Sequence, residues 1–411
     1  MQKPPPIAVL AAGSNITTLG LARCFAGTGV DVHAIDTDGS AGLLRRSKYI
    51  ERVTSFACRI SNPKGFVDEL CAAGQRYKAR EGRRVLLFPS EDGGLGLCAD
   101  HCQRLRDYFV LLGDPAETDP ARFLDKGRFF GALPREAPYV PRTMHFADFV
   151  SLEASRGELP YPAAVKPARK DIGMSFQKKL GAKLVIVESP EDLAGKLRAL
   201  FPREGVVVQE FIEHREGDEV CWWGYRSKRG DVTGMTAREM RKYPHPGGTA
   251  TFMRSEHVPQ LHEYAREILD RIGFWGLCEM PFLPAGPAGQ YKVLELNPRA
   301  WLQIGLMHRS GLNTPLMAYR EAMGVDVPVP DARARDGVIW MSPEYDLLRA
   351  LGSGRPARRF ANLAQWFRDM RRADDRTVWD CAEPGVIMAR LLSYPAKLWK
   401  NRAMIGAGRR L

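Results

Sequence analysis

The sequence contains no apolar run long enough to cross a lipid bilayer. Its apolar runs, such as Ile7 to Ala12, extend over only a few residues, whereas a membrane-spanning helix needs about 18 or more. The segment from Met1 to Pro6 leads directly into a short apolar stretch and shows neither the apolar region nor the cleavage site of an export signal. We therefore expect a cytoplasmic protein without a transmembrane helix.

The eight cysteines also lack the spacing of a metal site. The sequence contains no Cys-x-x-Cys pair and no paired Cys and His spacing typical of zinc sites. Cys98 and Cys102 stand four residues apart and could share one face of a helix, where a packing role is the simpler interpretation. Reduced thiols agree with a cytoplasmic location.

The composition is that of an ordinary folded protein with an uneven excess of basic residues. A chain of 411 residues with 45% hydrophobic and 26% charged residues is expected to form two or three domains. Of the net charge of +12, residues 331–411 contribute +7, from sixteen Lys and Arg against nine Asp and Glu. No nucleic-acid-binding motif accompanies these basic residues, so we expect no nucleic-acid partner.

The first residues indicate an α/β fold. Ile7 to Ala11 reads as a buried strand, Thr18 to Ala26 as a helix and Val30 to Ile35 as a second strand. This order predicts a parallel sheet with a ligand crevice at the loop after the first strand. The loop lacks the G-x-G-x-x-G pattern, so Asp36 alone is weak support for a nicotinamide dinucleotide site.

The remaining chain divides by composition and pattern into three further segments. The first domain is expected to span residues 1–120. A small α+β unit follows over residues 121–215, and strands and helices resume over 216–330. Residues 331–411 form a basic carboxy-terminal extension.

Acidic and amide side chains near residue 295 form the clearest candidate site. Residues i and i+2 of an extended strand point to the same face, so Glu295 and Asn297 should present their oxygens together. Glu279 lies sixteen positions earlier, within an apolar strand, where an unpaired carboxylate would be costly. If the two strands are adjacent, the oxygens suit Mg²⁺, and Arg299 adds a donor for phosphate or carboxylate.

Two lysines and two further acids precede this cluster. Lys166 ends an apolar strand beside a loop, where its ammonium group could contact phosphate oxygens. Lys126 lies forty residues upstream, and Glu210 and Glu219 lie downstream, at and after the end of another predicted strand. Each of these residues alone would more simply be a solvated surface charge.

Taken together, these residues resemble the ATP-grasp ligases over roughly residues 5 to 325. The resemblance implies an amino-terminal doubly wound pre-ATP-grasp domain followed by two α+β ATP-grasp subdomains that sandwich the nucleotide. It also implies that Lys126 and Lys166 contact phosphates, that Glu210 and the backbone of Ile212 meet the adenine, and that Glu219 binds the ribose.

The same resemblance gives the second half of the predicted site. Glu279, Glu295 and Asn297 match the ligands of Mg²⁺ or Mn²⁺, and Arg299 matches the arginine near the transferred phosphate, which together with Lys166 forms the expected catalytic pair. The Glu-x-Asn-Pro-Arg element with an upstream Glu is the specific part of the match. The phosphate loop, residues 168–173, departs from it because it is poorer in glycine than in many members.

The reaction implied by the family is the ATP-dependent joining of a carboxylate to an amine through an acylphosphate, with release of ADP and phosphate. The segment with Arg238, Arg241, Gly247 and Gly248 resembles the substrate loop of the carboxylate-amine ligase branch, which includes proteins like D-aspartate ligase. A hairpin turn with solvated basic residues is the alternative for this segment. Alternative functions are a carboxylase, a carbamoyl-phosphate-type enzyme and a non-catalytic ATP-binding protein. The partners expected are small-molecule carboxylate and amine substrates.

The extension lies outside the resemblance, and its role stays open at this stage. Its tryptophans and arginines could form a cap over the active-site cleft. Residues 386–405 are apolar and basic, like a segment that contacts a membrane surface, although Pro395 interrupts any continuous helix. The sequence favours packing of the extension on the core. The sequence gives no indication of oligomeric state.

Overall fold

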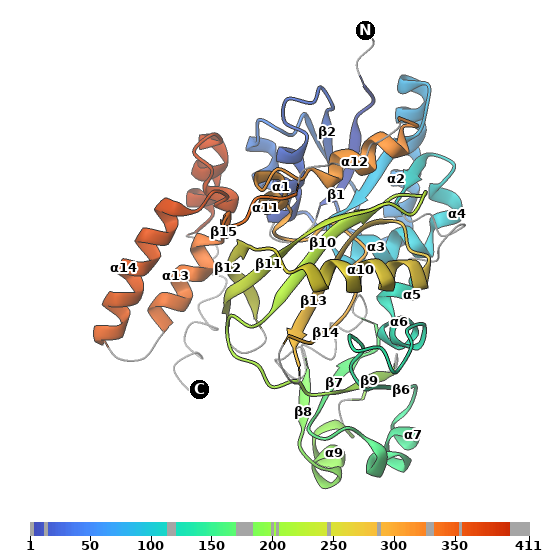
Figure 1. Cartoon of the computed structure of the whole chain (residues 1–411). Coiled ribbons are helices and arrows are strands. Elements are labelled where there is room, and N and C mark those ends of the chain that lie inside the picture. Colours follow the sequence, from blue (N-terminus) through green and yellow to red (C-terminus); the bar gives the residue numbers. More distant parts are fainter. Residues whose placement is uncertain are drawn as a thin grey trace.

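The computed structural model describes residues 4–11, 15–112, 121–169, 184–198, 201–202, 205–244, 248–285, 289–325, 333–352 and 356–394. Three sheets organise these residues, with the amino-terminal sheet at the top of Figure 1 and the smallest sheet at the bottom. Among the described helices, none combines the length and the hydropathy that crossing a membrane requires.

The amino-terminal sheet is parallel and has the strand order β3-β2-β1-β4-β5. Its strands are β1 (Ile7–Ala11), β2 (Val32–Asp36), β3 (Arg52–Ser55), β4 (Val85–Pro89) and β5 (Phe109–Leu111). Its helices are α1 (Ile16–Cys24), η1 (Ala41–Arg46), α2 (Pro63–Glu81), α3 (Asp92–Asp100) and α4 (Cys102–Leu105). Alternate residues of β1 enter two separate apolar clusters, so both faces of the sheet are covered. The predicted doubly wound domain is confirmed.

One detail of this domain differs from the sequence prediction. Cys98 lies in α3, whereas Cys102 begins α4, and the chain bends at His101 between them. The two thiols therefore do not share one continuous helix face.

The second unit is a four-stranded antiparallel sheet of order β6-β9-β7-β8. Its strands are β6 (Thr143–Phe146), β7 (Ala163–Pro167), β8 (Val185–Val187) and β9 (Val206–Glu210). The helices around it are α5 (Ala121–Leu124), α6 (Lys126–Gly131), α7 (Phe149–Ala154), η2 (Arg156–Glu158) and α9 (Pro190–Leu197). The Ser189 side chain caps α9, as its position before Pro190 predicts.

The third unit is a six-stranded antiparallel sheet of order β14-β13-β10-β11-β12-β15. Its first five strands in chain order are β10 (Val220–Arg226), β11 (Val232–Tyr243), β12 (Thr249–Ser255), β13 (Gly276–Pro284) and β14 (Tyr291–Val293). The helix α10 (Pro259–Ile272) packs on the sheet through apolar residues at helical spacing and ends at Gly273, whose φ of 64° suits glycine. The helices α11 (Ile304–Arg309) and α12 (Thr314–Ala322) follow the sheet.

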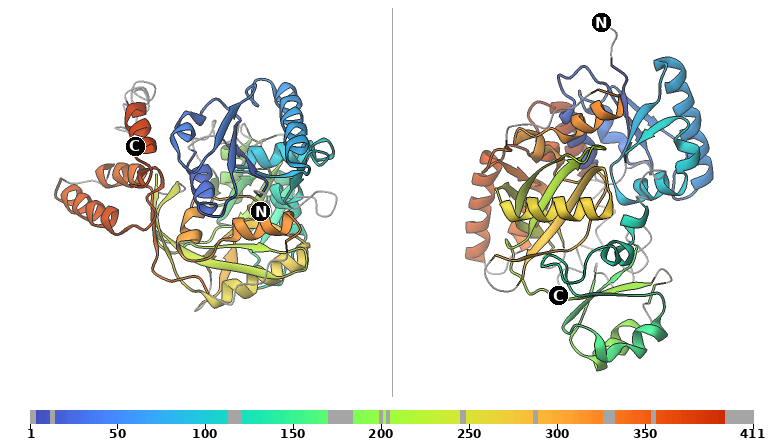
Figure 2. Two further views of the ribbon diagram at one scale, coloured as in Figure 1. Left: turned by 90° about the horizontal axis from the view of Figure 1, so that it is seen from above. Right: turned by 45° about the vertical axis from the view of Figure 1, so that its right-hand side comes forward.

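The carboxy-terminal extension continues the third sheet. Its strand β15 (Ile339–Met341) pairs antiparallel with β12, and α13 (Pro343–Gly352) and α14 (Pro356–Arg372) form a helical hairpin beside it. The turn η3 (Thr377–Trp379) and a helix over residues 384–394 follow. Figure 2 shows the hairpin projecting from the body of the molecule. The extension thus packs on the core, as the sequence favoured.

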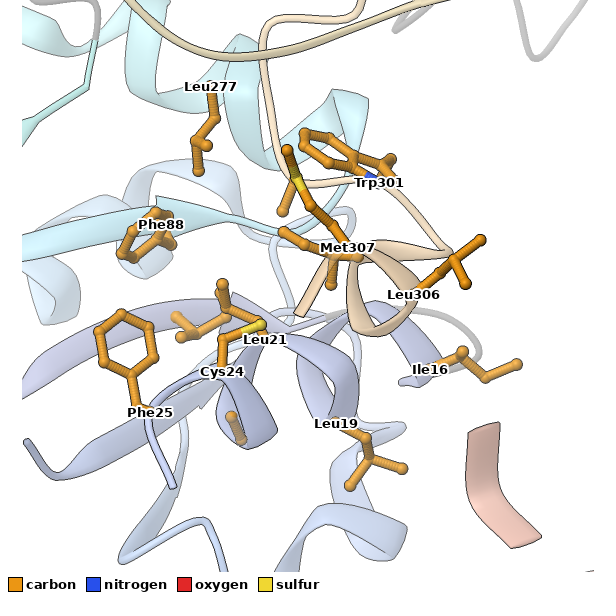
Figure 3. Close-up of a cluster of buried hydrophobic side chains, with 14 of the residues drawn as sticks. Ile16, Leu19, Leu21, Cys24, Phe25, Phe88, Leu277, Trp301, Leu306 and Met307 are labelled. Carbon is orange, nitrogen blue, oxygen red and sulfur yellow. The ribbon is translucent and has the colours of Figure 1, made fainter. Parts of the chain in front are cut away.

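A shared core joins the first and third units. Figure 3 shows apolar side chains of α1 and the following residue beside those of residues 301–307, together with one side chain each from β4 and β13: Ile16, Leu19, Leu21, Cys24, Phe25, Phe88, Leu277, Trp301, Leu306 and Met307. Gly20 lies at this contact because a Cβ there would press against Ile304. A buried ion cluster adds the extension to the same contact, since Arg23 of α1 pairs with Glu383 at 2.6 Å and lies 3.6 Å from Asp375.

Candidate active site

Glu279 and Asn297 are brought together by the backbone of the third unit. Glu279 lies in the middle of β13, and residues 294–299 run beside it after β14 ends. The Glu279 N–H donates to the Asn297 carbonyl at 3.0 Å, and the Asn297 N–H donates back at 2.8 Å. This antiparallel bridge produces the adjacency that the sequence analysis assumed for the two segments.

The side chains of the predicted metal cluster converge around the amide of Asn297. Its Nδ2 donates to Glu279 Oε2 at 3.2 Å and to Glu295 Oε1 at 3.3 Å. The indole N–H of Trp223 on β10 donates to the other Glu279 oxygen at 3.1 Å. The two carboxylates therefore converge on one point, where their negative charges would attract a cation. Binding of that cation by Asn297 would require its amide to turn so that Oδ1 replaces Nδ2. Within the described residues, no group of three or more His, Cys, Asp and Glu side chains could hold a metal ion.

Two basic side chains border the carboxylates. Lys126, at the start of α6, is buried and lies 3.3 Å from Glu295 Oε2. Arg299 lies 4.0 Å from Glu279 Oε2, and its Nε donates to Asp92 Oδ1 at 2.7 Å. Asp92 comes from α3 of the amino-terminal domain, so the site draws its charged groups from all three units. Asp92, Lys126, Glu295 and Asn297 line one pocket together with apolar side chains of α5 and α6.

The neighbouring carboxylates keep the Arg299 guanidinium charged. Burial by itself would lower the pKa of the Arg299 guanidinium, but the neighbouring Asp92, Glu279 and Glu295 carboxylates outweigh burial and raise it. The thiol of Cys278 beside the site has a raised pKa because it is buried and because Glu279 is near. Cys278 therefore stays protonated at neutral pH and is unsuited to act as a nucleophile.

Lys166 and Lys126 are neighbours through the backbone. The N–H of Lys126 donates to the carbonyl of Ala168 at 2.9 Å, two residues after Lys166. Lys166 Nζ donates to Gln209 Oε1 at 3.0 Å across the β7–β9 pair, which fixes the ammonium group on the face of the second sheet. The predicted phosphate loop that follows, apart from residues 168–169, falls outside the described residues.

The expected adenine-binding positions lie where the second and third units meet. Glu210 ends β9 and accepts from the Arg142 N–H at 3.1 Å. Its Oε1 also lies 3.0 Å from Nζ of Lys292 on β14, an ion pair between the two sheets. The carbonyl of Ile212 lies 2.9 Å from Nδ1 of His214.

Glu219 belongs to a buried group around one lysine. Nζ of Lys242, on β11, lies 3.1 Å from Glu219 and 2.6 Å from Glu239. Burial would lower the pKa of Lys242, but these two carboxylates raise it, so the ammonium stays charged. The expected ribose-binding acid is therefore one of two carboxylates that hold Lys242 in a charged cluster between the start of β10 and the second half of β11.

The residues expected to bind substrate are two arginines that carboxylates hold in place and two glycines of the loop. Arg238 pairs with Glu256 at 2.6 Å and donates to the Gly217 carbonyl at 3.0 Å, so its guanidinium braces loops of the third unit. Gly248 lies directly before β12, and a Cβ at this position would overlap the carbonyl oxygen of Pro244. Gly247 lies outside the described residues.

Arg241 is held by the carboxy-terminal extension. Its guanidinium donates to both oxygens of Asp346 on α13, at 2.9 and 3.0 Å, and to Asp369 on α14 at 2.8 Å. A shift in the β11–β12 register occurs at this residue, and its side chain stacks on the Phe252 ring. The base of the predicted substrate loop is thus tied to the helical hairpin.

Three residues of the site were missed by sequence reasoning: Asp92, Trp223 and Lys292. A usable signal existed for Asp92, because Glu91-Asp92-Gly93 follows β4, and ligands of α/β sheets bind beyond the carboxyl ends of strands. Trp223 lies within an apolar run and reads as core, and Lys292 reads as a solvated charge. No local pattern distinguishes those two residues.

The sequence is similar to that of the D-aspartate ligase of Enterococcus faecium (strain Aus0004), with 24% identity over 314 residues that cover 73% of each chain. No protein-family model matches the chain. Among solved structures, N5-carboxyaminoimidazole synthetase from Staphylococcus aureus, complexed with ADP, aligns with a TM-score of 0.62 and 14% identity over 85% of this chain and 86% of that one. The biotin carboxylase domain of Hydrogenobacter thermophilus 2-oxoglutarate carboxylase, in complex with MgADP and bicarbonate, aligns with a TM-score of 0.60 and 15% identity over 82% and 74%.

The three-unit architecture and the similarity to these structures show that the chain has the ATP-grasp fold. This fold and the sequence similarity to D-aspartate ligase support the resemblance to the ATP-grasp ligases that the motifs indicated. The sequence similarity of the chain lies with the carboxylate-amine ligase branch, as the motifs predicted.

Proposed function

We propose that this ATP-grasp ligase joins a carboxylate to an amine, using ATP and Mg²⁺ or Mn²⁺, through an acylphosphate. In the first step a carboxylate oxygen attacks the γ-phosphorus of ATP and ADP leaves. In the second step the amine nitrogen attacks the acyl carbon, phosphate leaves, and the nitrogen loses a proton. The product is an amide or a peptide bond.

The observation that carries the proposal is the convergence of Glu279, Glu295 and Asn297 beside Lys126 and Arg299. Two carboxylates and an amide cannot supply all the ligands of a metal ion. Such an incomplete set suits Mg²⁺, because this ion commonly keeps water and phosphate oxygens among its ligands. When bound there, the ion would neutralise charge on the phosphate oxygens. The solved structures of similar fold with ADP or MgADP support the nucleotide as the second ligand.

The side chains of this chain would position the reactants and stabilise charge. Lys126 and Lys166 are assigned to the phosphate oxygens, and Arg299 to the group being transferred, where its planar guanidinium can contact two oxygens at once. Glu210 and the Ile212 backbone are assigned to the adenine, and Glu219 to the ribose. Phosphoryl transfer depends mainly on such positioning and charge stabilisation, so no covalent enzyme residue is needed.

The substrate loop is assigned to residues 238–249, in which Gly247 and Gly248 would offer backbone N–H groups to the carboxylate. Arg241 supports this loop from its base through Asp346 and Asp369. Arg238 supports it through Glu256. In this assignment both arginines position the loop, and direct contact of either with the substrate would require release from its partners.

A carboxylase is the second candidate, because the solved structures of similar fold include a biotin carboxylase domain and N5-carboxyaminoimidazole synthetase. The two candidates differ in the acceptor that stimulates release of ADP. Bicarbonate should stimulate a carboxylase, whereas an amino acid or another small carboxylate with an amine partner should stimulate a carboxylate-amine ligase.

The test is ADP release from ATP and Mg²⁺ against a panel of amino acids of both configurations, sugar acids, peptides and bicarbonate. We expect stimulation by a carboxylate and amine pair, and loss of turnover by orders of magnitude in Glu295→Ala. The matched control is Glu263→Ala, which removes an exposed carboxylate from α10. Full activity of Glu295→Ala with an unchanged melting temperature would contradict the assignment of the metal site.

The acylphosphate is tested separately by chemical trapping. With hydroxylamine in place of the amine, the activated carboxylate should give a hydroxamate, and the nucleotide product should be ADP. Release of AMP and pyrophosphate would overturn the mechanism, because it requires attack at the α-phosphorus.

A further inference from the structure

The helix α14 leaves an aromatic stripe exposed on its outer face. Phe360 and Phe367 are 75% and 61% exposed, and their spacing of seven residues places them on the same face with Ala364 between them. A neighbouring face of the helix packs against the core through Trp366 and Met370, and the Trp366 ring also contacts the Phe367 ring edge to face, with the ring centroids 4.9 Å apart. Large exposed aromatic side chains on one helix face are unusual for a surface that contacts only water.

The exposed charges of α14 itself are basic. Among the side chains of this helix that the structure describes, the exposed charged ones are arginines at positions 359, 368, 371 and 372. Asp369 is the only acidic residue of the helix, and it is buried and paired with Arg241 at 2.8 Å. The outer face of α14 is therefore apolar along its centre and positively charged along its sides.

Two neighbouring helices of the extension also expose apolar side chains. On α13, Tyr345, Leu348 and Leu351 are 42%, 48% and 45% exposed and recur every three residues. On the helix over residues 384–394, Leu392 is 73% exposed. Exposed large apolar side chains thus recur on each α-helix described for residues 333–394, and α13 and α14 project from the body of the molecule (Figure 2).

The inner faces of the hairpin are already occupied. Asp346 of α13 and Asp369 of α14 hold Arg241 from the two helices, and Arg349 pairs with Glu216 at 2.6 Å. These contacts fix the orientation of the hairpin on the third sheet. The outward faces carry the exposed apolar and basic side chains. A ligand that binds these faces would therefore have to combine apolar contact with negative charge.

We propose that the α13–α14 hairpin binds the surface of an anionic lipid bilayer, with Phe360 and Phe367 of α14 entering the interface and the flanking arginines contacting lipid phosphates. An amphipathic helix with aromatic residues on one face and basic residues beside it is suited to lie in the plane of a membrane interface. Each arginine near an anionic surface adds to the attraction. The exposed charges of the helix are all of the sign that this surface attracts, which favours lipid over an uncharged apolar partner.

This inference is independent of the proposed catalytic function, since the assay contains no nucleotide. Full-length protein is sedimented with vesicles of phosphatidylcholine alone or of phosphatidylcholine mixed with phosphatidylglycerol. We expect binding to the mixed vesicles only, weakened by added salt. Phe360→Ser with Phe367→Ser, and separately a glutamine replacement of the four exposed arginines, should each weaken binding by about tenfold or more.

The matched control is Ile60→Ser with Val150→Ser, which removes two side chains, 76% and 77% exposed, far from the extension in the chain. This variant should bind like the wild type. A further full-length variant replaces Lys397, Lys400 and Arg402 by glutamine, because residues 395–411 carry five basic and no acidic residues.

Each remaining outcome overturns the proposal. Absence of binding to the mixed vesicles excludes a lipid partner for the hairpin. Loss of binding in the 397–402 variant with full binding in both α14 variants would assign the contact to residues 395–411. Light scattering could instead detect a dimer that dissociates when Phe360 and Phe367 are replaced. In that case a second copy of the chain, and not lipid, would bind this face.

Discussion

The contact between Asp92 and Arg299 is the strongest link between the amino-terminal domain and the candidate active site. Asp92 Oδ1 accepts from Arg299 Nε at 2.7 Å, whereas the next carboxylate, Glu279, lies 4.0 Å from the guanidinium. In Asp92→Asn the charge is lost while the size of the side chain is kept. The guanidinium should then move toward Glu279 and compete with the metal ion for that carboxylate.

The expected size of the effect follows from these distances. With an effective dielectric constant of about 20, a pair of unit charges is worth ~6 kcal/mol at 2.7 Å and ~4 kcal/mol at 4.0 Å. The difference of about 2 kcal/mol is an upper bound, because the Arg299 and Asp92 side chains keep 13% and 18% of their solvent exposure. A loss of about 10- to 30-fold in turnover is therefore expected, since 1.4 kcal/mol is a factor of ten.

The assay is ADP release at varied ATP and Mg²⁺ concentrations, with the carboxylate that stimulates it most. Because Asp92 acts through Arg299, kcat and the apparent Mg²⁺ affinity should fall while the KM for ATP changes little, and Asp92→Glu should recover part of the activity. Asp100→Asn, which alters an exposed acid at the other end of α3, should match the wild type. An unchanged kcat and Mg²⁺ dependence in Asp92→Asn would refute the positioning role.

Three further predictions concern binding and stability. Lys166→Ala should weaken ATP binding about tenfold or more in calorimetry, because a charged hydrogen bond to phosphate is lost. Arg23→Met should lower the free energy of unfolding by about 3–5 kcal/mol in urea titrations, since it leaves the buried Glu383 and its neighbouring carboxylates uncompensated. The pKa of His262 is lowered to about 4, mainly by burial and then by the charge of His257. In the unfolded chain this histidine takes up a proton below about pH 6.5, so the free energy of unfolding should fall as the pH drops from about 6.5 to 4. His262→Gln should make this fall smaller.

The controls for these predictions use exposed residues of the same type. Lys196→Ala, in the second unit, should leave ATP affinity unchanged, and equal affinities for all three proteins would remove Lys166 from the site. Arg104→Met breaks an exposed pair with Asp68 and should leave the free energy of unfolding nearly unchanged, and an equally small effect of Arg23→Met would contradict the buried network. For His262, parallel stability curves of variant and wild type between pH 4 and 6.5 would contradict the assignment.

The sequence alone determined the features that depend on local periodicity. Consecutive apolar residues in β1 and β4 indicated strands buried on both faces, and both strands lie in the parallel sheet. The period of two along an expected strand placed Glu295 and Asn297 on one side. Their side chains are in contact, although the strand β14 ends before them, at Val293. The order of the charged motifs along the chain indicated a resemblance to the ATP-grasp ligases, and the fold and the sequence similarity support it.

Only the tertiary structure decided which distant groups meet. Asp92 and Arg299 are separated by 207 residues, and Arg241 is separated by 105 residues from Asp346 and by 128 from Asp369. A hydrophobic pattern reports which face of an element is buried, but not which other element covers that face. The partners of Asp92, Arg241 and Glu210 depend on how three sheets pack against one another, because each pair forms only when its two backbones are held a few ångströms apart.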